Sequence, residues 1–274
     1  MIKNIIFSGG GLKGWAYVGT LQALDELNLL YSFRKDLEQV IGVSIGSLFG
    51  LFYVLDIKWD YLLDLIMEIN FKDMFDSDIN DIFNNQSIIA GLKFINIIKE
   101  IMSTRINPES TFNELKEYTN VIFTVNALNI SKSKLEYFNY ILTPDIKVID
   151  AVRASAGIPI IFPAYFINGS YYYDGGICNN CPIDKVDELS TIAFDIGFSQ
   201  DNNSNIKLFD LLNALIRITN NTYKRDGTVF QILDERFNKE TLNLDQSRDD
   251  IFNIYIFGYI NSKKHIYDNF FALK

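Results

Sequence analysis

The sequence predicts an α/β fold in which a mostly parallel central sheet is sandwiched by helices. Short apolar runs of strand length alternate along the chain with longer runs whose apolar residues recur at helical spacing. A buried strand over 3–8 precedes a helix over 15–29, and a second strand over 38–43 precedes an apolar helix over 45–55. Strands that alternate with helices in this way are typical of parallel sheets covered by helices.

The remaining elements continue this alternation. Further helices are predicted over 59–69, 87–103, 111–119, 147–154, 206–224 and 262–272, and further strands over 120–128, 134–139, 163–173, 190–197 and 251–258. Ser110 or Thr111 is the expected N-cap of the helix that follows Pro108. The acidic, Asn-rich stretch over 72–85 is either a solvated connection or a mobile lid. Because no internal repeat or low-complexity linker divides the chain, residues 1–274 are expected to form one domain.

The charge and the histidine count exclude several functions. The chain has 34 acidic and 25 basic side chains, a net charge of −9, whereas a nucleic-acid-binding protein needs a basic surface to displace counterions. The same acidity argues against polybasic attachment to a membrane. His265 is the single histidine, so a histidine-based zinc site is excluded and a Ser-His-Asp triad would have to use His265 itself. We therefore expect no nucleic-acid partner and no metal ion.

The compartment is also constrained. Two cysteines are too few for a secreted disulfide scaffold, which indicates a reducing environment. The apolar run at the N-terminus is too short for a signal peptide, and no stretch of about 18 uncharged apolar residues could span a bilayer. The expected location is intracellular, either in the cytoplasm or peripherally at membranes.

Ser44 lies in a G-x-S-x-G motif, Gly42-Val43-Ser44-Ile45-Gly46, between a predicted strand and a predicted helix. A nucleophile elbow needs this context, because a tight strand-to-helix turn forces the serine backbone into a strained conformation. Gly42 and Gly46 suit such a turn, since side chains at these positions would collide. The N-terminus of the following helix favours negative charge near Ser44. The alternative is a serine in an ordinary turn.

The glycine-rich segment GGGLKG at 9–14 follows the first strand and opens the first helix. It contains the G-x-G-x-x-G pattern of dinucleotide-binding proteins, which also expects an acidic residue at the end of the second strand. Asp36 and Glu38 lie near the required spacing, but the second strand ends in the serine motif instead. We therefore favour an oxyanion hole over a dinucleotide site, because successive glycine amides can converge on one point. Its donors would be the amides of Gly9, Gly10 and Gly11.

Asp174 lies in Tyr173-Asp174-Gly175-Gly176, after an aromatic strand. Asp-Gly is a common turn sequence, so a plain turn is one interpretation. The other is a general base, because a serine nucleophile without an available histidine needs a carboxylate in its place. The glycines after Asp174 would allow its carboxylate to approach Ser44 closely.

The order GGGLKG, GVSIGS and DGG resembles that of the patatin-like phospholipases, which are serine acyl hydrolases with a Ser-Asp dyad. Three further segments are similar to family motifs: TFNEL at 111–115, AVRASAGIP at 151–159 continuing to Phe162-Pro163, and DGGICNNCP at 174–182. The resemblance covers roughly residues 3–200. Residues 201–274 match no motif and are interpreted as a divergent C-terminal part of the same domain.

The resemblance implies a three-layer α/β/α fold and a role for each motif residue. Ser44 would be the nucleophile, Asp174 the general base, and the Gly9–Gly11 loop the oxyanion hole, with help from the Ile45 N–H. Cys178 and Cys181 occupy positions that are commonly apolar in the family, so their C-x-x-C spacing indicates core packing rather than redox chemistry. The glycines with structural roles in the motifs would be Gly14, Gly42, Gly46, Gly175 and Gly176.

The function implied by the resemblance is lipid acyl hydrolysis of the phospholipase A or lysophospholipase type. The substrate would be a phospholipid or another acyl-ester lipid, whose carboxylic ester is cleaved through an acyl-enzyme without a cofactor. Transient contact with a membrane surface is expected, and the need for a protein activator stays open. The alternative is a catalytically silent lipid-binding protein on the same fold.

Overall fold

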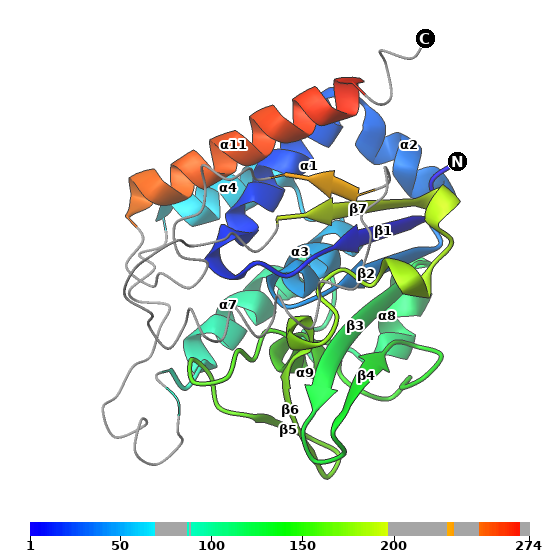
Figure 1. Cartoon of the computed structure of the whole chain (residues 1–274), viewed down its shortest axis with the longest axis vertical. Coiled ribbons are helices and arrows are strands. Elements are labelled where there is room, and N and C mark those ends of the chain that lie inside the picture. The colour runs from blue at the N-terminus through cyan, green and yellow to red at the C-terminus, as the bar shows by residue number, and fades with distance from the viewer. Residues whose placement is uncertain (69–86, 88, 197–228, 233–246, 269–274) are drawn as a thin grey trace.

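The computed structural model describes residues 1–68, 87, 89–196, 229–232 and 247–268, and in this part of the chain eight strands form one mixed sheet (Figure 1). Hydrogen-bonded neighbours follow the order β5-β6-β3-β2-β1-β7-β8, and β4 also pairs with β3. The pairs among β1, β2, β3, β7 and β8 are parallel, whereas β4 and β6 run antiparallel to β3. The strands are β1 (Asn4–Phe7), β2 (Gln39–Gly42), β3 (Ile122–Asn129), β4 (Lys134–Phe138), β5 (Tyr165–Ile167), β6 (Ser170–Asp174), β7 (Thr191–Asp195) and β8 (Val229–Gln231).

Helices flank this sheet, so the fold is α/β with mostly parallel strands, as the sequence predicts. The α-helices described are α1 (Ala16–Glu26), α2 (Leu29–Asp36), α3 (Ile45–Val54), α4 (Trp59–Glu68), α7 (Leu92–Ser103), α8 (Phe112–Thr119), α9 (Val148–Ser155) and α11 (Arg248–Ile266). Short 3₁₀ helices are η1 (Gly11–Trp15), η2 (Gly175–Ile177), η3 (Ile183–Lys185) and η4 (Glu188–Ser190). Within the described ranges, no helix has the length and apolar character needed to cross a membrane.

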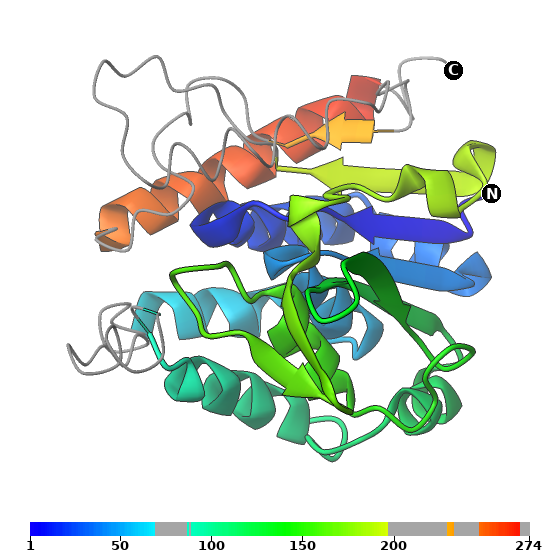
Figure 2. The ribbon, with the colours of Figure 1, turned by 60° about the horizontal axis from the view of Figure 1, so that its bottom comes forward.

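Both faces of the sheet are buried, which explains why its central strands are apolar throughout. Ile5 and Phe7 of β1 join the main core, where the ring of Phe7 meets Tyr17 edge-on at 5.2 Å. Ile6 points to the other face and joins a smaller cluster that includes Ile183 from η3. Figure 2 shows β7, β1 and β2 side by side in the sheet. Each large side chain buried in this way contributes about 1.5–3 kcal/mol.

The register on β3 brings two strand ends face to face. Ala127 pairs with Glu136 of β4 and with Asp174 of β6, so β4 and β6 must lie on opposite edges of β3. Val125 pairs with both β4 and Gly42 of β2, which places β2 on the same edge as β6. Because β2 is parallel and β6 antiparallel to β3, their carboxyl ends point at each other. The offset of two positions between Val125 and Ala127 corresponds to about 7 Å along β3.

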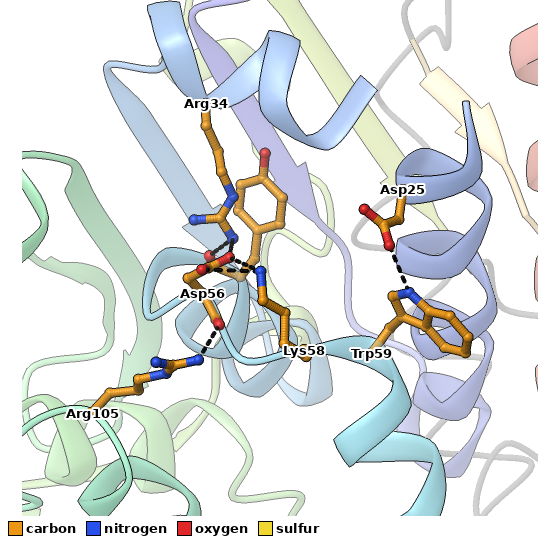
Figure 3. A network of polar contacts seen from close by, with 7 residues as sticks. Asp25, Arg34, Asp56, Lys58, Trp59 and Arg105 are labelled. Carbon is orange, nitrogen blue, oxygen red and sulfur yellow. Dashed lines mark hydrogen bonds and ion pairs between the residues drawn. The ribbon is translucent and has the colours of Figure 1, made fainter. Parts of the chain in front are cut away.

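The far end of α3 is tied to neighbouring helices (Figure 3). Asp56 follows this helix with a left-handed backbone, φ 55°, and its carboxylate pairs with Arg34 of α2 at 3.2 Å. Arg105 donates to the Asp56 carbonyl at 3.1 Å, and the Arg34 guanidinium lies 4.5 Å from the Tyr53 ring centroid. Partly exposed pairs of this kind contribute at most about 1 kcal/mol each. Their effect is to connect α2 and the end of α7 to the helix that begins after Ser44.

The C-terminal region contains one long helix where the sequence predicted a strand over 251–258 and a helix over 262–272. α11 begins with a capping box, in which the Ser247 hydroxyl accepts from the Asp250 amide and the Asp250 carboxylate accepts from the Ser247 amide. Gly258 lets α11 approach the backbone of α1 closely, as Figure 1 shows. The strand prediction was wrong because closely spaced Ile, Phe and Tyr residues fit both periodicities, and the cap and the packing decide.

The first predicted helix, over 15–29, ends earlier in the structure, and the helix that follows it was not predicted. α1 ends at Glu26, Asn28 adopts a left-handed backbone with φ 57°, and α2 follows as a separate helix. The helix predicted over 87–103 begins only at Leu92, because Gly91 precedes it with φ 82°. Asn28 follows the end of α1 and Gly91 precedes the start of α7, and in both places the helix does not extend across the left-handed residue.

Most other boundaries agree with the prediction. Thr111 is the N-cap of α8, where it forms a capping box with Glu114. The aromatic strand predicted over 163–173 is the hairpin of β5 and β6, since residues 168 and 169 form its turn. The helix predicted over 206–224 and the acidic stretch over 72–85 lie outside the described residues.

Candidate active site

Ser44 occupies the turn between β2 and α3 with φ 52° and ψ −129°. A non-glycine residue in such a conformation costs about 1–3 kcal/mol, which the surrounding structure must offset. The flanking glycines permit the turn: a Cβ on Gly42 would lie 2.4 Å from Ser47 Cα, and one on Gly46 would lie 2.2 Å from the Phe7 carbonyl oxygen. The sequence motif thus forms a tight turn that presents Ser44 at the N-terminus of α3.

The structure brings Ser44 and Asp174 together. Ser44 Oγ donates a hydrogen bond of 2.5 Å to Asp174 Oδ2. The other carboxylate oxygen, Oδ1, accepts the Gly176 amide at 2.7 Å. The two residues are only 5% and 4% exposed, so the pair is largely shielded from water. This pairing follows from the strand register, because Ser44 comes after β2 and Asp174 ends β6.

Burial dominates the electrostatics of the pair. It raises the pKa of Asp174 to about 7, although the hydrogen bonds from Ser44 and the Gly176 amide favour the charged form and lower it. The carboxylate therefore titrates near neutral pH rather than near pH 4. A group that gains and loses a proton in this range is suited to proton transfer at neutral pH.

The glycine loop lies directly against this pair. A Cβ on Gly9 would stand 2.9 Å from Ser44 Cβ and 2.4 Å from Asn180 Oδ1. Asn180 holds the loop in place. Its side-chain Nδ2 donates to the Gly9 carbonyl at 3.0 Å, and its main-chain carbonyl accepts the Gly9 amide at 3.4 Å. The side chains packed over Gly9 disfavour a dinucleotide pyrophosphate in the same place.

The other loop glycines have separate reasons to lack a side chain. A Cβ on Gly10 would lie 2.4 Å from Ile196, and one on Gly14 would lie 2.3 Å from Ile45. Gly11 has a left-handed backbone with φ 58°. This crowding fixes the loop between β1 and the start of α3.

A buried polar network holds the C-terminal end of β1, from which the glycine loop begins. Ser8 Oγ donates to Asp195 Oδ1 at 2.8 Å, and the Tyr17 hydroxyl donates to the Ser8 carbonyl at 2.8 Å. Ser8 Oγ also accepts the Ile196 amide at 3.2 Å. Buried polar groups that are satisfied in this way hold a unique geometry.

The glycines after Asp174 also face close neighbours. A Cβ on Gly175 would stand 2.2 Å from Asn126 Oδ1, and one on Gly176 would stand 2.6 Å from Asn180 Oδ1. The Asp-Gly-Gly sequence is thus more than a solvent-exposed turn. The two glycines allow the chain to turn into η2 while the Gly176 amide keeps its hydrogen bond to the Asp174 carboxylate.

Two further contacts were not predicted from the sequence. Ser155, the last residue of α9, accepts the Ser44 amide on its hydroxyl at 2.9 Å. The Gly157 carbonyl accepts the Asp174 amide, also at 2.9 Å. Both residues lie in the AVRASAGIP motif, which is the only sequence signal for them, because their partners are distant in the chain.

The sulfur side chains contribute to packing. Cys181 is half-buried and contacts the small cluster that contains Ile6 and Ile183. Cys178 is half-buried too, and burial raises the pKa of its thiol. Among the residues that the structure describes, no group of three or more His, Cys, Asp or Glu side chains is placed to hold a metal ion.

His265 lies in α11, whereas Ser44 and Asp174 lie at the ends of β2 and β6. Its ring meets Phe230 of β8 edge-on at a centroid distance of 4.6 Å, and burial lowers its pKa. The hydrogen bonds of the Asp174 carboxylate come from Ser44 and Gly176 instead.

Substitution of His265 by alanine should therefore leave ester hydrolysis at the wild-type rate. A loss of stability is expected, because an aromatic pair of this kind contributes about 0.5–1.5 kcal/mol. Initial rates with a soluble ester and thermal unfolding of both proteins would check this. A selective fall in kcat with unchanged folding would instead indicate a triad.

Comparisons with known proteins show the family and the fold. A family model described as patatin-like phospholipase matches residues 5–187. A probable lipid hydrolase of Invertebrate iridescent virus 6 is 30% identical over 82% of this chain and 72% of its own length. A lysophospholipase of Aspergillus fumigatus is 26% identical over 73% of this chain but only 12% of its own length. The structure of VipD from Legionella pneumophila has the same fold, with a TM-score of 0.56 and 15% identity over 97% of this chain and 67% of that chain.

Proposed function

This chain belongs to the patatin-like phospholipase family, and from this premise we propose that it hydrolyses carboxylic ester bonds of phospholipids or other acyl lipids. The observation that carries the proposal is the hydrogen bond from Ser44 Oγ to a buried Asp174 carboxylate. A serine hydroxyl is a weak nucleophile unless a base takes its proton, and the carboxylate lies in direct contact with that proton. The names of the viral and fungal relatives supply the substrate class.

In the first half of the reaction, Asp174 accepts the hydroxyl proton while Ser44 Oγ attacks the acyl carbonyl carbon. The carbonyl oxygen becomes an oxyanion, and the tetrahedral intermediate collapses with cleavage of the ester bond. The departing alkoxide takes the proton from Asp174 and leaves as the lysolipid or alcohol. The acyl group stays on Ser44, and Asp174 is again ionised.

The oxyanion would be stabilised by main-chain amides of the glycine loop. Gly10 and Gly11 donate to no acceptor among the described residues, whereas the Gly9 amide already has the Asn180 carbonyl at 3.4 Å. The proposed donors are therefore Gly10 and Gly11, with the Ile45 amide at the start of α3. An amide of this kind typically contributes about 10²–10³-fold in rate.

In the second half, a water molecule attacks the acyl-enzyme while Asp174 accepts one of its protons. Collapse of the second tetrahedral intermediate releases the fatty acid, and Ser44 regains its proton from Asp174. Asp174 must be ionised at the start of each half. Activity should therefore increase as the pH rises through about 7, where this carboxyl loses its proton.

The test is product analysis with phosphatidylcholine vesicles that carry different fatty acids at the two glycerol positions. Mass spectrometry should detect a free fatty acid and the matching lysolipid, in equal amounts for as long as the lysolipid is not itself cleaved. The Ser44→Ala variant, incubated in parallel, should release neither. If the wild-type protein binds the vesicles but releases no fatty acid from them or from a soluble ester, it is a silent lipid-binding protein and the proposal fails.

A further inference from the structure

We propose that the segment from Ser155 to Gly157, where α9 ends, is a clamp that positions Ser44 and Asp174 relative to each other. Ser155 is then a positioning residue for the reaction, although it touches neither the substrate nor the transferred proton. This inference rests on the proposed function of the Ser44–Asp174 pair.

The clamp closes a ring of three contacts. The Ser155 hydroxyl accepts the Ser44 amide at 2.9 Å, and two residues later the Gly157 carbonyl accepts the Asp174 amide at 2.9 Å. The side chains of Ser44 and Asp174 complete the ring with their bond of 2.5 Å. One short segment thus holds the backbones of both residues, which are 130 positions apart in the chain.

Ser44 needs such a partner because its amide is buried at the start of a helix. Ser44 is the N-cap of α3, where amides have no acceptor within the helix, and the residue is buried. A buried N–H group without an acceptor is destabilising, and this cost would add to the strain of the turn. The Ser155 hydroxyl supplies the acceptor, so the turn that presents Ser44 is stabilised by α9 and not by α3 alone.

α9 is rigid enough to serve as a reference. Seven of its eight residues are buried, and it contacts α3, α7, β3, β5 and β6. The Arg153 guanidinium lies 4.5 Å from the Phe162 ring centroid, which fixes the chain just after the clamp. Rigid support of this kind is what keeps reacting groups within the small tolerances that catalysis needs.

The Ser155→Ala variant tests the clamp. Without the acceptor, Ser44 can leave its strained conformation and its bond to Asp174 lengthens. We expect kcat to fall about 10- to 100-fold, with KM for a soluble ester unchanged within about twofold. Because the Ser44 hydrogen bond lowers the Asp174 pKa, its loss should also move the acid limb of the pH profile to higher pH.

Two companion variants separate positioning from stability. Ser262→Ala removes a similarly buried hydroxyl, bonded to Thr20 at 2.9 Å between α1 and α11, and should change neither kcat nor the acid limb. Ser155→Thr keeps the acceptor oxygen and should restore the wild-type limb. If Ser155→Ala does not fold, Ser155→Cys replaces it, because a sulfur of similar size accepts hydrogen bonds only weakly.

The outcomes are distinct. The clamp is wrong if Ser155→Ala, or Ser155→Cys in its place, keeps the wild-type kcat and acid limb, or if its rate falls only in proportion to its unfolded fraction. Failure of the proposed function would give a different result, because the wild-type protein itself, and not only the Ser155 variants, would then release no fatty acid.

Discussion

Replacement of Ser44 by alanine should abolish covalent labelling by a fluorophosphonate and lower ester hydrolysis by on the order of 10⁴-fold or more. The hydroxyl that contacts Asp174 is the only proposed nucleophile, and the glycine amides alone cannot replace it. Thermal stability should stay close to that of the wild type, because alanine fits the volume of the serine. The measurements are gel-based labelling, initial rates and thermal unfolding.

The matched control is Ser262→Ala, which replaces a similarly buried serine between α1 and α11. This variant should label and hydrolyse as the wild type does. Retention of labelling in Ser44→Ala would instead mean that another side chain is activated, and the Ser44–Asp174 mechanism would have to be abandoned.

The Asp174→Asn variant should lose activity to a similar degree and at the same time gain stability. Asparagine keeps the shape of the side chain: its oxygen can accept the Gly176 amide and its amino group can donate to Ser44 Oγ. It cannot accept the serine proton, so hydrolysis should fall by on the order of 10⁴-fold. The wild-type rate, in contrast, should rise with pH through about 7 as Asp174 ionises.

The gain in stability should depend on pH. Burial raises the folded-state pKa of Asp174 to about 7, above its value of about 4 in an unfolded chain. Between these pKa values the folded protein holds a proton that the unfolded chain has lost, so this group lowers stability as the pH rises through the window. Asparagine does not titrate in this range. The stability of the Asp174→Asn variant relative to the wild type should therefore begin to increase above about pH 4 and reach its full value above about pH 7.

The measurement is the difference in Tm between Asp174→Asn and the wild type at a series of pH values. At pH 8 we expect the free energy of unfolding of the variant to exceed that of the wild type by at least about 1 kcal/mol, which corresponds to a Tm about 2–4 °C higher. Near pH 4 the difference should vanish. A variant that is less stable than the wild type at pH 8 would show that Asp174 is not a buried, desolvated charge in the folded protein.

Local order along the chain was predictable where short-range signals agree. The strand, glycine turn and helix around Ser44 follow from neighbours within four residues, and the capping box at Thr111 is likewise local. The first half of the C-terminal helix was mistaken for a strand because its Ile, Phe and Tyr residues also fit that periodicity, and the Ser247 capping box and the packing against α1 distinguish the two. The early end of α1 was missed although Asn28 is of a residue type that often adopts the left-handed conformation at helix ends.

The sequence by itself determined the family, the residue types of the candidate site, and the turns that carry them. The glycine at 42 is needed by a conflict with Ser47, which lies within the same short motif, whereas the glycine at 46 is needed by the close approach of the Phe7 carbonyl from β1. The tertiary structure alone decided that Ser44 and Asp174 meet, because their contact depends on β2 and β6 sharing one edge of β3. It also decided the near-neutral pKa of Asp174 and the contact from Ser155, since burial and hydrogen bonds between distant segments exist only after the chain has folded.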